Sequence, residues 1–178
     1  MDEINAKYNQ VVLVDSQDRQ IGTMDKVKAH QHPVPLHRAI SIVIVNGRGE
    51  MLLQKRSQQK PTWPLYWSNA CCTHPFDGEP GRVCAKRRLQ EEMGFTTPLK
   101  YLFKYQYDAR FDKTWGECEL DSVYWGKYTG QVKPNPAEAE DYKWLPFAVL
   151  KSDIANNPSI YTPWFRDILR LLEKRKAV

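Results

Sequence analysis

The chain has 178 residues, of which 42% are apolar and 26% are charged, and its formal net charge is +5. These values are typical of one globular domain with its own core, and we expect a single domain over residues 1–178. No apolar run approaches the ~20 residues that a membrane helix needs. The start MDEINAKYNQ has neither the basic nor the apolar segment of a secretory signal, so we expect a cytoplasmic protein.

The basic excess leaves several kinds of partner open. It is compatible with a nucleic acid, an anionic membrane or a phosphorylated small molecule. It is equally compatible with charge that only keeps the surface solvated. The distribution of the basic residues along the chain must decide between these partners.

The first half of the chain predicts two hairpins. The apolar run 11–15 is followed by a polar turn, 16–19, and by Ile21-Gly22, which indicates a hairpin. The β-branched run AISIVIV at 39–45 predicts a buried central strand. Asn46-Gly47 is a strong turn signal, and a strand resumes after it.

A helix is predicted over residues 79–93. Pro80 suits a first helical position, the apolar residues repeat every four positions, and Gly94 is placed to end the helix. Two further strands are predicted at 101–107 and 117–125.

The last part of the chain predicts a loop at 134–137 and a final helix that begins at Thr162-Pro163, with Thr162 as its cap. The basic run 174–176 would lie at the negative end of this helix. The side chains expected to face inward are Trp164, Phe165, Ile168, Leu169 and Leu172. The whole pattern predicts an α+β fold, in which a mixed β-sheet is flanked by helices as an α/β/α sandwich.

The helix at 79–93 resembles the box of the Nudix family, G-x5-E-x7-R-E-U-x-E-E-x-G-U, where U is a bulky apolar residue. Two positions depart from it: Thr73 stands in place of the first Gly, and Arg88 in place of the Glu after Arg. The residues that match the box are Glu79, Arg87, Leu89, Glu91, Glu92, Gly94 and Phe95.

The departure at Arg88 changes the expected chemistry. A diphosphate hydrolase needs several carboxylates to gather Mg²⁺ and activate water. Residues 88, 91 and 92 share one helix face, which here carries one Arg and two Glu. Arg88 can bind a phosphate oxygen but not a metal, so this face is suited to holding a diphosphate rather than cutting it. The other interpretation is an ordinary charged helix with i,i+4 pairs.

Two adjacent cysteines lie in the stretch WSNACCTHP, just before His74. Four cysteines in a chain of this length do not indicate a disulfide framework, and Cys71 and Cys72 could not bridge each other without strain. The C-x-x-C spacing of a redox pair is missing, and a zinc finger would need a second close Cys–His pair. We therefore expect free thiols.

The segment W-x-N-x2-C-x-H-P, with E-x-E downstream, resembles the type I isopentenyl-diphosphate isomerase family, whose members have a Nudix fold and do not hydrolyse. The resemblance extends from about Val11 to Trp164. It covers, in chain order, Lys26, His30, His37, Arg56, Lys60, Trp67, Asn69, Cys72, His74, Glu117 and Glu119.

This resemblance implies a role for each matching position. Cys72, fixed by the C-x-H-P spacing, would be the catalytic cysteine and Glu119 the catalytic acid, while Cys71 would be a small buried residue. Tyr107 and Trp164 would line the reaction site. Residues facing the phosphates would be Lys26, Arg56, Lys60 and Arg88. Ligands of one divalent ion would be His30, His37, His74, Glu117 and Glu119, and Glu92 would bind a Mg²⁺ that accompanies the substrate diphosphate.

The residues themselves support the metal assignment. Glu117 and Glu119 are two positions apart, so on a strand they point to the same side, and Asp121 is a further candidate on that side. Three histidines with two carboxylates suit Mn²⁺, Zn²⁺ or Fe²⁺ more than Ca²⁺.

The implied activity is an isomerase of isoprene biosynthesis. Its substrate would be a five-carbon homoallylic diphosphate, whose double bond is protonated to a tertiary cation before a proton leaves from C2. Glu119 would deliver the first proton, alone or with Tyr107 or a water molecule. Cys72 would take the second proton as a thiolate. Trp164 would stabilise the cation.

Two other functions remain as alternatives. A Nudix hydrolase of nucleoside diphosphates would require a Glu at position 88 and would not require Cys72. An RNA-binding module would use the basic excess but would have no use for three histidines with Glu117. We expect neither a nucleic acid nor a membrane as partner, and the sequence leaves the oligomeric state open.

Overall fold

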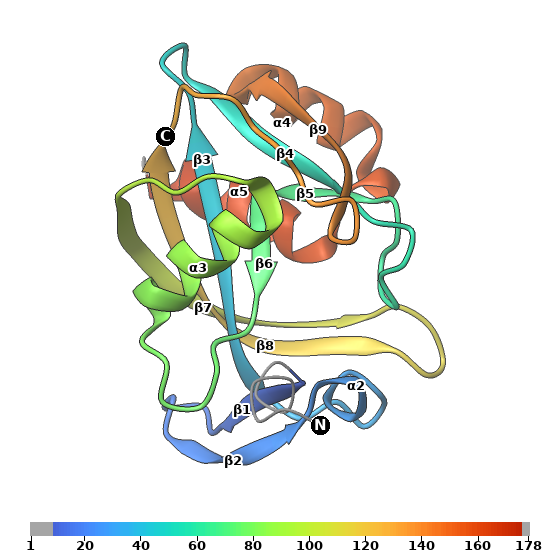
Figure 1. Ribbon diagram of the computed structural model, residues 1–178. Coiled ribbons are helices and arrows are strands. Elements are labelled where there is room, and N and C mark those ends of the chain that lie inside the picture. The colour runs from blue at the N-terminus through green and yellow to red at the C-terminus, as the bar shows by residue number, and fades with distance from the viewer. Residues whose placement is uncertain (1–8, 176–178) are drawn as a thin grey trace.

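The computed structural model describes residues 9–175 as a mixed sheet with helices on both faces (Figure 1). Its strands are β1 (Gln10–Val14), β2 (Gln20–Asp25), β3 (His37–Val45), β4 (Glu50–Arg56), β5 (Trp67–Asn69), β6 (Cys71–Thr73), β7 (Leu99–Arg110), β8 (Gly116–Lys127) and β9 (Ala139–Pro146). Its helices are α2 (Lys26–Ala29), α3 (Gly81–Met93), α4 (Phe147–Asn156) and α5 (Pro163–Lys174), with a short 3₁₀ turn η1 at Pro158–Ile160.

Strand β3 is the centre of the sheet. It pairs in parallel with β8 along its whole length, and antiparallel with β1, β4 and β6. The β3–β8 register sets His37 opposite Glu119, and the β3–β6 register sets Ser41 opposite Cys72. His37 begins β3 and Ser41 lies at its middle, so the first half of β3 carries both pairs.

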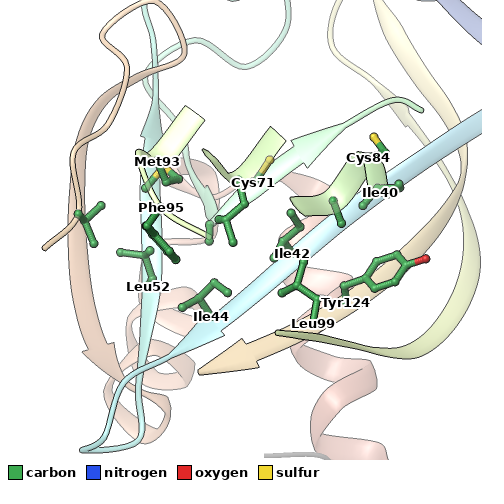
Figure 2. Close-up of a cluster of buried hydrophobic side chains, with 14 of the residues drawn as sticks. Ile40, Ile42, Ile44, Leu52, Cys71, Cys84, Met93, Phe95, Leu99 and Tyr124 are labelled. Carbon is green, nitrogen blue, oxygen red and sulfur yellow. The ribbon is translucent and has the colours of Figure 1, made fainter. Parts of the chain in front are cut away.

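Side chains of β3 alternate between two cores, as the two-residue period of a strand requires. Ile40, Ile42 and Ile44 pack with Leu89 and other residues of α3 (Figure 2). Val43 instead belongs to the cluster that includes α5. The sheet therefore has a buried face on each side, which confirms the predicted layered arrangement.

The predicted hairpins and strands are confirmed within the described residues. β1 and β2 pair antiparallel around the turn at 15–19, and the predicted central strand is buried from Ala39 to Ile44. Asn46 organises the β3–β4 turn, because its side chain accepts from the backbone N–H groups of Arg48 and Glu50. The predicted strands at 101–107 and 117–125 are the central parts of β7 and β8.

Helix ends differ in detail from the prediction. Pro80 is the N-cap of α3 rather than its first helical residue, and Gly94 ends the helix with φ +76°, as expected. Thr162 is the N-cap of α5, but its hydroxyl lies 3.0 Å from Ser68 Oγ and, among the described residues, makes no capping bond. The five inward side chains predicted for α5 are all buried. Lys174 lies in its last turn, whereas position 176 is outside the described residues.

None of the described helices, within residues 9–175, has the length and hydropathy needed to cross a membrane.

Candidate active site

One cavity of about 260 Å³ is lined by residues of α2, β6, β7, β8 and α5, among others. It combines apolar walls with histidine, carboxylate, thiol and basic side chains. Its chemically functional lining residues are Lys26, His30, Arg56, Lys60, Cys72, His74, Tyr107, Glu117, Glu119 and Trp164. Ten of the sequence-predicted residues therefore share one cavity, although they come from segments far apart in the chain.

The two adjacent cysteines point to opposite faces of β6. Cys71 is fully buried in the core beside α3, where Figure 2 shows it among apolar side chains. Cys72 lies on the other face, against the cluster that contains Trp164. All four cysteines are free. The strand geometry thus presents Cys72, and not Cys71, to the cavity.

Polar groups surround the Cys72 thiol. Trp164 Nε1 lies 3.0 Å from Sγ and donates to it, and Sγ is 3.1 Å from Asn69 Oδ1. The hydroxyls of Ser68 and Ser41 lie at 3.6 and 3.8 Å. Burial nevertheless raises the pKa of Cys72 to about 12, so the thiol keeps its proton at neutral pH in the ligand-free protein.

Three histidines converge on one oxygen of Glu119. Glu119 Oε1 lies 2.9 Å from His74 Nε2, 3.5 Å from His37 Nε2 and 3.9 Å from His30 Nε2. One ligand atom from each of these four residues falls within 4.8 Å of the others. The group can hold a metal ion.

Backbone carbonyls orient two of the imidazoles. His30 Nδ1 lies 2.7 Å from the Lys26 carbonyl, and His37 Nδ1 lies 2.9 Å from the Pro35 carbonyl. Each Nδ1 therefore carries the hydrogen when the ring is neutral, which leaves the Nε2 lone pair directed at Glu119. Among residues 9–175, the buried His37 Nε2 finds no hydrogen-bond partner. This is the donor arrangement that a divalent cation requires.

Burial keeps most of this cluster in the form that binds metal. It lowers the pKa of His30 to about 4 and the pKa of His74 well below its ordinary value. Burial also acts to lower the pKa of His37, but the negative charge of Glu119, 3.5 Å from Nε2, helps to outweigh it, and the pKa is raised. Against burial, contacts with His37 and His74 hold the pKa of Glu119 well below its usual range.

Tyr107 links Glu119 to Glu117. Its hydroxyl lies 2.6 Å from Glu119 Oε2 and 2.8 Å from Glu117 Oε2, and Thr62 Oγ1 donates to Glu117 Oε1 at 3.0 Å. Burial and the charge of Glu119 raise the pKa of Glu117 to about 7. Glu117 is outside the four-residue ligand group and is joined to Glu119 through the Tyr107 hydroxyl.

The Trp164 ring forms one wall of the cavity. It is almost completely buried and makes a perpendicular contact with Trp63, with ring centres 5.2 Å apart. Tyr107 lies 6.0 Å away, centre to centre, and the Arg56 guanidinium is 5.2 Å from the ring centre. Arg56 is itself held by the backbone carbonyls of Trp63 and Thr62, at 3.1 and 2.8 Å.

Arg88 and Glu92 lie outside this cavity. Arg88 borders a neighbouring cavity of about 200 Å³, which also touches Lys26, Thr73 and His74. Its guanidinium is 2.7 Å from Glu92 Oε1, and Glu92 is only 2% exposed. Arg88, which was predicted to bind phosphate, therefore forms an ion pair with Glu92, which was predicted to bind Mg²⁺.

Several residues at the site had no predicted role. Ser41 Oγ donates to Asp121 Oδ2 at 2.7 Å, and burial raises the pKa of Asp121 to about 8. Asp121, a candidate ligand by its strand side, contacts Ser41 and lies outside the ligand group. Ser68 and Glu138 could not be found from motif spacing, because the folded chain brings them to partners that are distant in the sequence.

Comparisons with known proteins find relatives of one family. A family model described as a NUDIX domain matches residues 35–165. The chain is 42% identical over 156 residues to isopentenyl-diphosphate Delta-isomerase 1 of Aromatoleum aromaticum, with 88% of each protein covered. It is 41% identical over 169 residues to isopentenyl-diphosphate Delta-isomerase 2 of Photorhabdus laumondii, covering 95% of this chain and 92% of that protein.

Solved structures agree on the fold. A crystal structure of a Deinococcus radiodurans protein superimposes with a TM-score of 0.75 at 17% identity, covering 90% of this chain and 97% of the other. The MutT protein of Methanosarcina mazei gives a TM-score of 0.67 at 19% identity, covering 80% and 96%. At these identities the likeness concerns the fold alone.

Proposed function

The chain belongs to the isopentenyl-diphosphate Delta-isomerase family of Nudix-fold proteins, and from that premise we propose that it interconverts isopentenyl diphosphate and dimethylallyl diphosphate in isoprenoid biosynthesis. It would be an intramolecular oxidoreductase that transposes a C=C bond by protonation and deprotonation through a tertiary carbocation. It would act as a single cytoplasmic domain.

One observation carries the proposal. The same 260 Å³ cavity holds a thiol, a carboxylate–phenol pair, an indole ring and three basic side chains. A five-carbon diphosphate needs this combination: groups that handle protons at the alkene, an electron-rich wall beside the cation, and positive charge for the diphosphate. A hydrolase site would need none of the thiol chemistry.

Glu119 and Tyr107 would deliver the first proton. The Tyr107 hydroxyl touches both Glu119 and Glu117, so a proton can be held anywhere along these three groups. The raised pKa of Glu117, about 7, makes it the carboxyl that retains a proton near neutral pH. Glu117 would therefore hold the proton between turnovers and pass it on through Tyr107 and Glu119, because the lowered pKa of Glu119 keeps that carboxyl charged.

Cys72 would first lose its own proton to solvent and would then take, as a thiolate, the proton that leaves from C2; the positive charge of Arg56 acts to favour the thiolate. Trp164 Nε1 donates to Sγ, and the hydroxyls of Ser41 and Ser68 lie close enough to support negative charge on it. These donors hold the sulfur in one position, which favours transfer to a defined carbon.

Trp164 would stabilise the cationic intermediate. Its contacts with Trp63 and Tyr107 fix the ring, and a desolvated indole face stabilises a cation by on the order of 2 kcal/mol. Its N–H meanwhile points to Cys72, so one side chain positions both the cation and the base.

Two divalent ions would take part. The converging nitrogen and oxygen atoms of His30, His37, His74 and Glu119 fit a Mn²⁺, a Zn²⁺ or a similar ion, with Glu117 nearby as a further carboxylate. Such an ion supplies Lewis acidity and positive charge when bound. Glu92 would contribute to a Mg²⁺ that arrives with the diphosphate.

Lys26, Arg56, Lys60 and Arg88 would anchor the diphosphate. The first three line the cavity wall and the last borders the adjoining cavity. Their inward arrangement suits a small anion better than a nucleic acid or a membrane surface.

The adjacent cysteines provide a matched test. We predict that Cys72→Ala lowers isomerase activity by at least about a thousandfold, because the base is lost, whereas Cys71→Ala retains most of it. Conversion of isopentenyl diphosphate would be followed by proton NMR. Near-normal activity of Cys72→Ala would show that this mechanism is wrong.

A further inference from the structure

Glu138 bridges two of the cations expected to hold the diphosphate. Its Oε1 lies 2.8 Å from Arg88 Nη2, and its Oε2 forms an ion pair with Lys60 Nζ. The side chains of the three residues are 14–23% exposed, so these pairs are partly shielded from water. Positive charge from Lys60 and Arg88, against burial, lowers the pKa of Glu138 to about 2.

The backbone holds Glu138 in this place. Its carbonyl accepts from Ser57 N at 3.0 Å, and its N–H donates to the Asn135 carbonyl at 2.9 Å. Asn135 N in turn donates to the Glu92 carbonyl at the end of α3, at 2.8 Å. The carboxylate is thus tied to the helix that carries Arg88 and to the loop that carries Lys60.

The hydrogen bonds of Arg88 show what a phosphate would have to displace. Its Nε donates to Thr73 Oγ1 at 3.1 Å and its Nη1 to Glu91 Oε2 at 2.8 Å. Both hydrogens of Nη2 are taken, by Glu92 at 2.7 Å and Glu138 at 2.8 Å. A guanidinium has five N–H donors, so one Nη1 hydrogen remains for a ligand. A two-point grip on a phosphoryl group requires release of a carboxylate.

Of the two carboxylates that take the Nη2 hydrogens of Arg88, Glu138 is the more easily released. Glu92 is 2% exposed in the helix, whereas Glu138 borders the 200 Å³ cavity together with Arg88 and Lys26. A carboxylate and a phosphoryl group offer the same kind of acceptor oxygen to the same donors. Glu138 therefore occupies the position that a phosphoryl group would take between Lys60 and Arg88.

We propose that Glu138 is a positioning residue of the diphosphate site, an internal anion that holds Lys60 and Arg88 in place and competes with the ligand for them. This inference rests on the proposed function, since it assumes that these cations meet a diphosphate. Competition of this kind weakens diphosphate binding and favours product release.

The test is the charge-neutral variant Glu138→Gln, with inorganic diphosphate and Mg²⁺ as the probe. We expect the Kd for diphosphate, measured by calorimetry, and the KM for substrate each to fall about tenfold, the order expected for one unit of like charge in a partly solvated site. The kcat should fall or stay unchanged, because release becomes slower. Glu140→Gln, which removes the same charge from an exposed position two residues along, should leave both constants unchanged.

A second variant separates charge from fold. Glu138→Asp keeps the charge and should bind diphosphate as the wild type does, and thermal unfolding would verify that each variant is folded. An unchanged or raised Kd for Glu138→Gln, with wild-type activity intact, would overturn this inference alone. Wild-type protein that binds diphosphate without isomerising would overturn only the proposed function. Wild-type protein that binds no diphosphate would overturn both.

Discussion

At the scale of single residues, the two oxygens of Glu119 have different neighbours. Oε1 faces the three histidine Nε2 atoms, and Oε2 accepts from the Tyr107 hydroxyl at 2.6 Å. The oxygen that faces the candidate ligand group and the oxygen that accepts from Tyr107 are therefore different atoms of one carboxylate. A cation held by His30, His37, His74 and Glu119 would favour the charged form of Glu119 and leave Tyr107 as the neighbouring group that still carries a proton.

The ligand set gives a prediction at this scale. His74→Ala should weaken metal binding by about 100-fold or more, since losses of supporting contacts alone cost 10–100-fold. His32→Ala is the matched control, because His32 is exposed and lies outside the ligand group. Metal content after dialysis would be measured by mass spectrometry. Equal metal content in the two variants would remove His74 from the ligand set.

At the scale of elements, units with a clear apolar period could be predicted, whereas α4, β5, β6 and β9 were not predicted. β3 has a long β-branched apolar run, and α5 has apolar residues repeating at helical spacing, so the local sequence predicts both. β5 and β6 have three residues each, too few for a period, and exist because β3 and β4 offer them edges to pair with. β9 has a polar sequence that is held in place by pairing with β4.

The end of α3 shows how one element positions another. Gly94 ends the helix with φ +76°, and the chain then returns so that Lys133 N donates to the Met93 carbonyl at 3.0 Å. A Cβ on Gly94 would lie 2.5 Å from the Lys133 carbonyl oxygen. This close approach fixes the position of the loop after Lys133, which places Glu138 beside Lys60 and Arg88.

Gly94→Ala should therefore lower the free energy of unfolding by about 2–4 kcal/mol, through backbone strain and the clash together. Gly78→Ala is the control. It has a similar φ of +71° but open space around the new Cβ, and should cost about 1 kcal/mol. Urea unfolding of both variants would test this, and equal losses would contradict the role assigned to the Gly94–Lys133 contact.

At the scale of the whole molecule, the site is assembled from distant segments. His30 follows α2, His37 begins β3, His74 follows β6 and Glu119 lies in β8. The match to the family motif identified these residues in the sequence. Their convergence depends on the parallel β3–β8 register and on the β3–β6 pairing. Contacts such as Glu138 with Lys60, 78 positions apart, had no sequence signal because charged side chains are common on any surface.

The charge of Glu138 is expected to stabilise the fold and to weaken diphosphate binding. Its pKa in the folded protein, about 2, is below the ordinary 4.5, so its charge stabilises the fold above about pH 4.5 and this contribution is lost as the pH falls towards 2. Glu138→Gln should thus be less stable than wild type by about 2–3 kcal/mol at pH 7, and by only about 1 kcal/mol at pH 3. Guanidinium unfolding at the two pH values would measure this difference. An equal loss of unfolding free energy at pH 7 and pH 3 would show that the ion pairs of Glu138 are not the cause.

The proposed isomerase adds a proton to one carbon of its substrate and removes a proton from another. Proton NMR of the protein with isopentenyl diphosphate and Mg²⁺ in D₂O is the most direct test of this chemistry. We expect dimethylallyl diphosphate with deuterium in its methyl group and no phosphate release. Release of phosphate, or product without deuterium from the solvent, would contradict it.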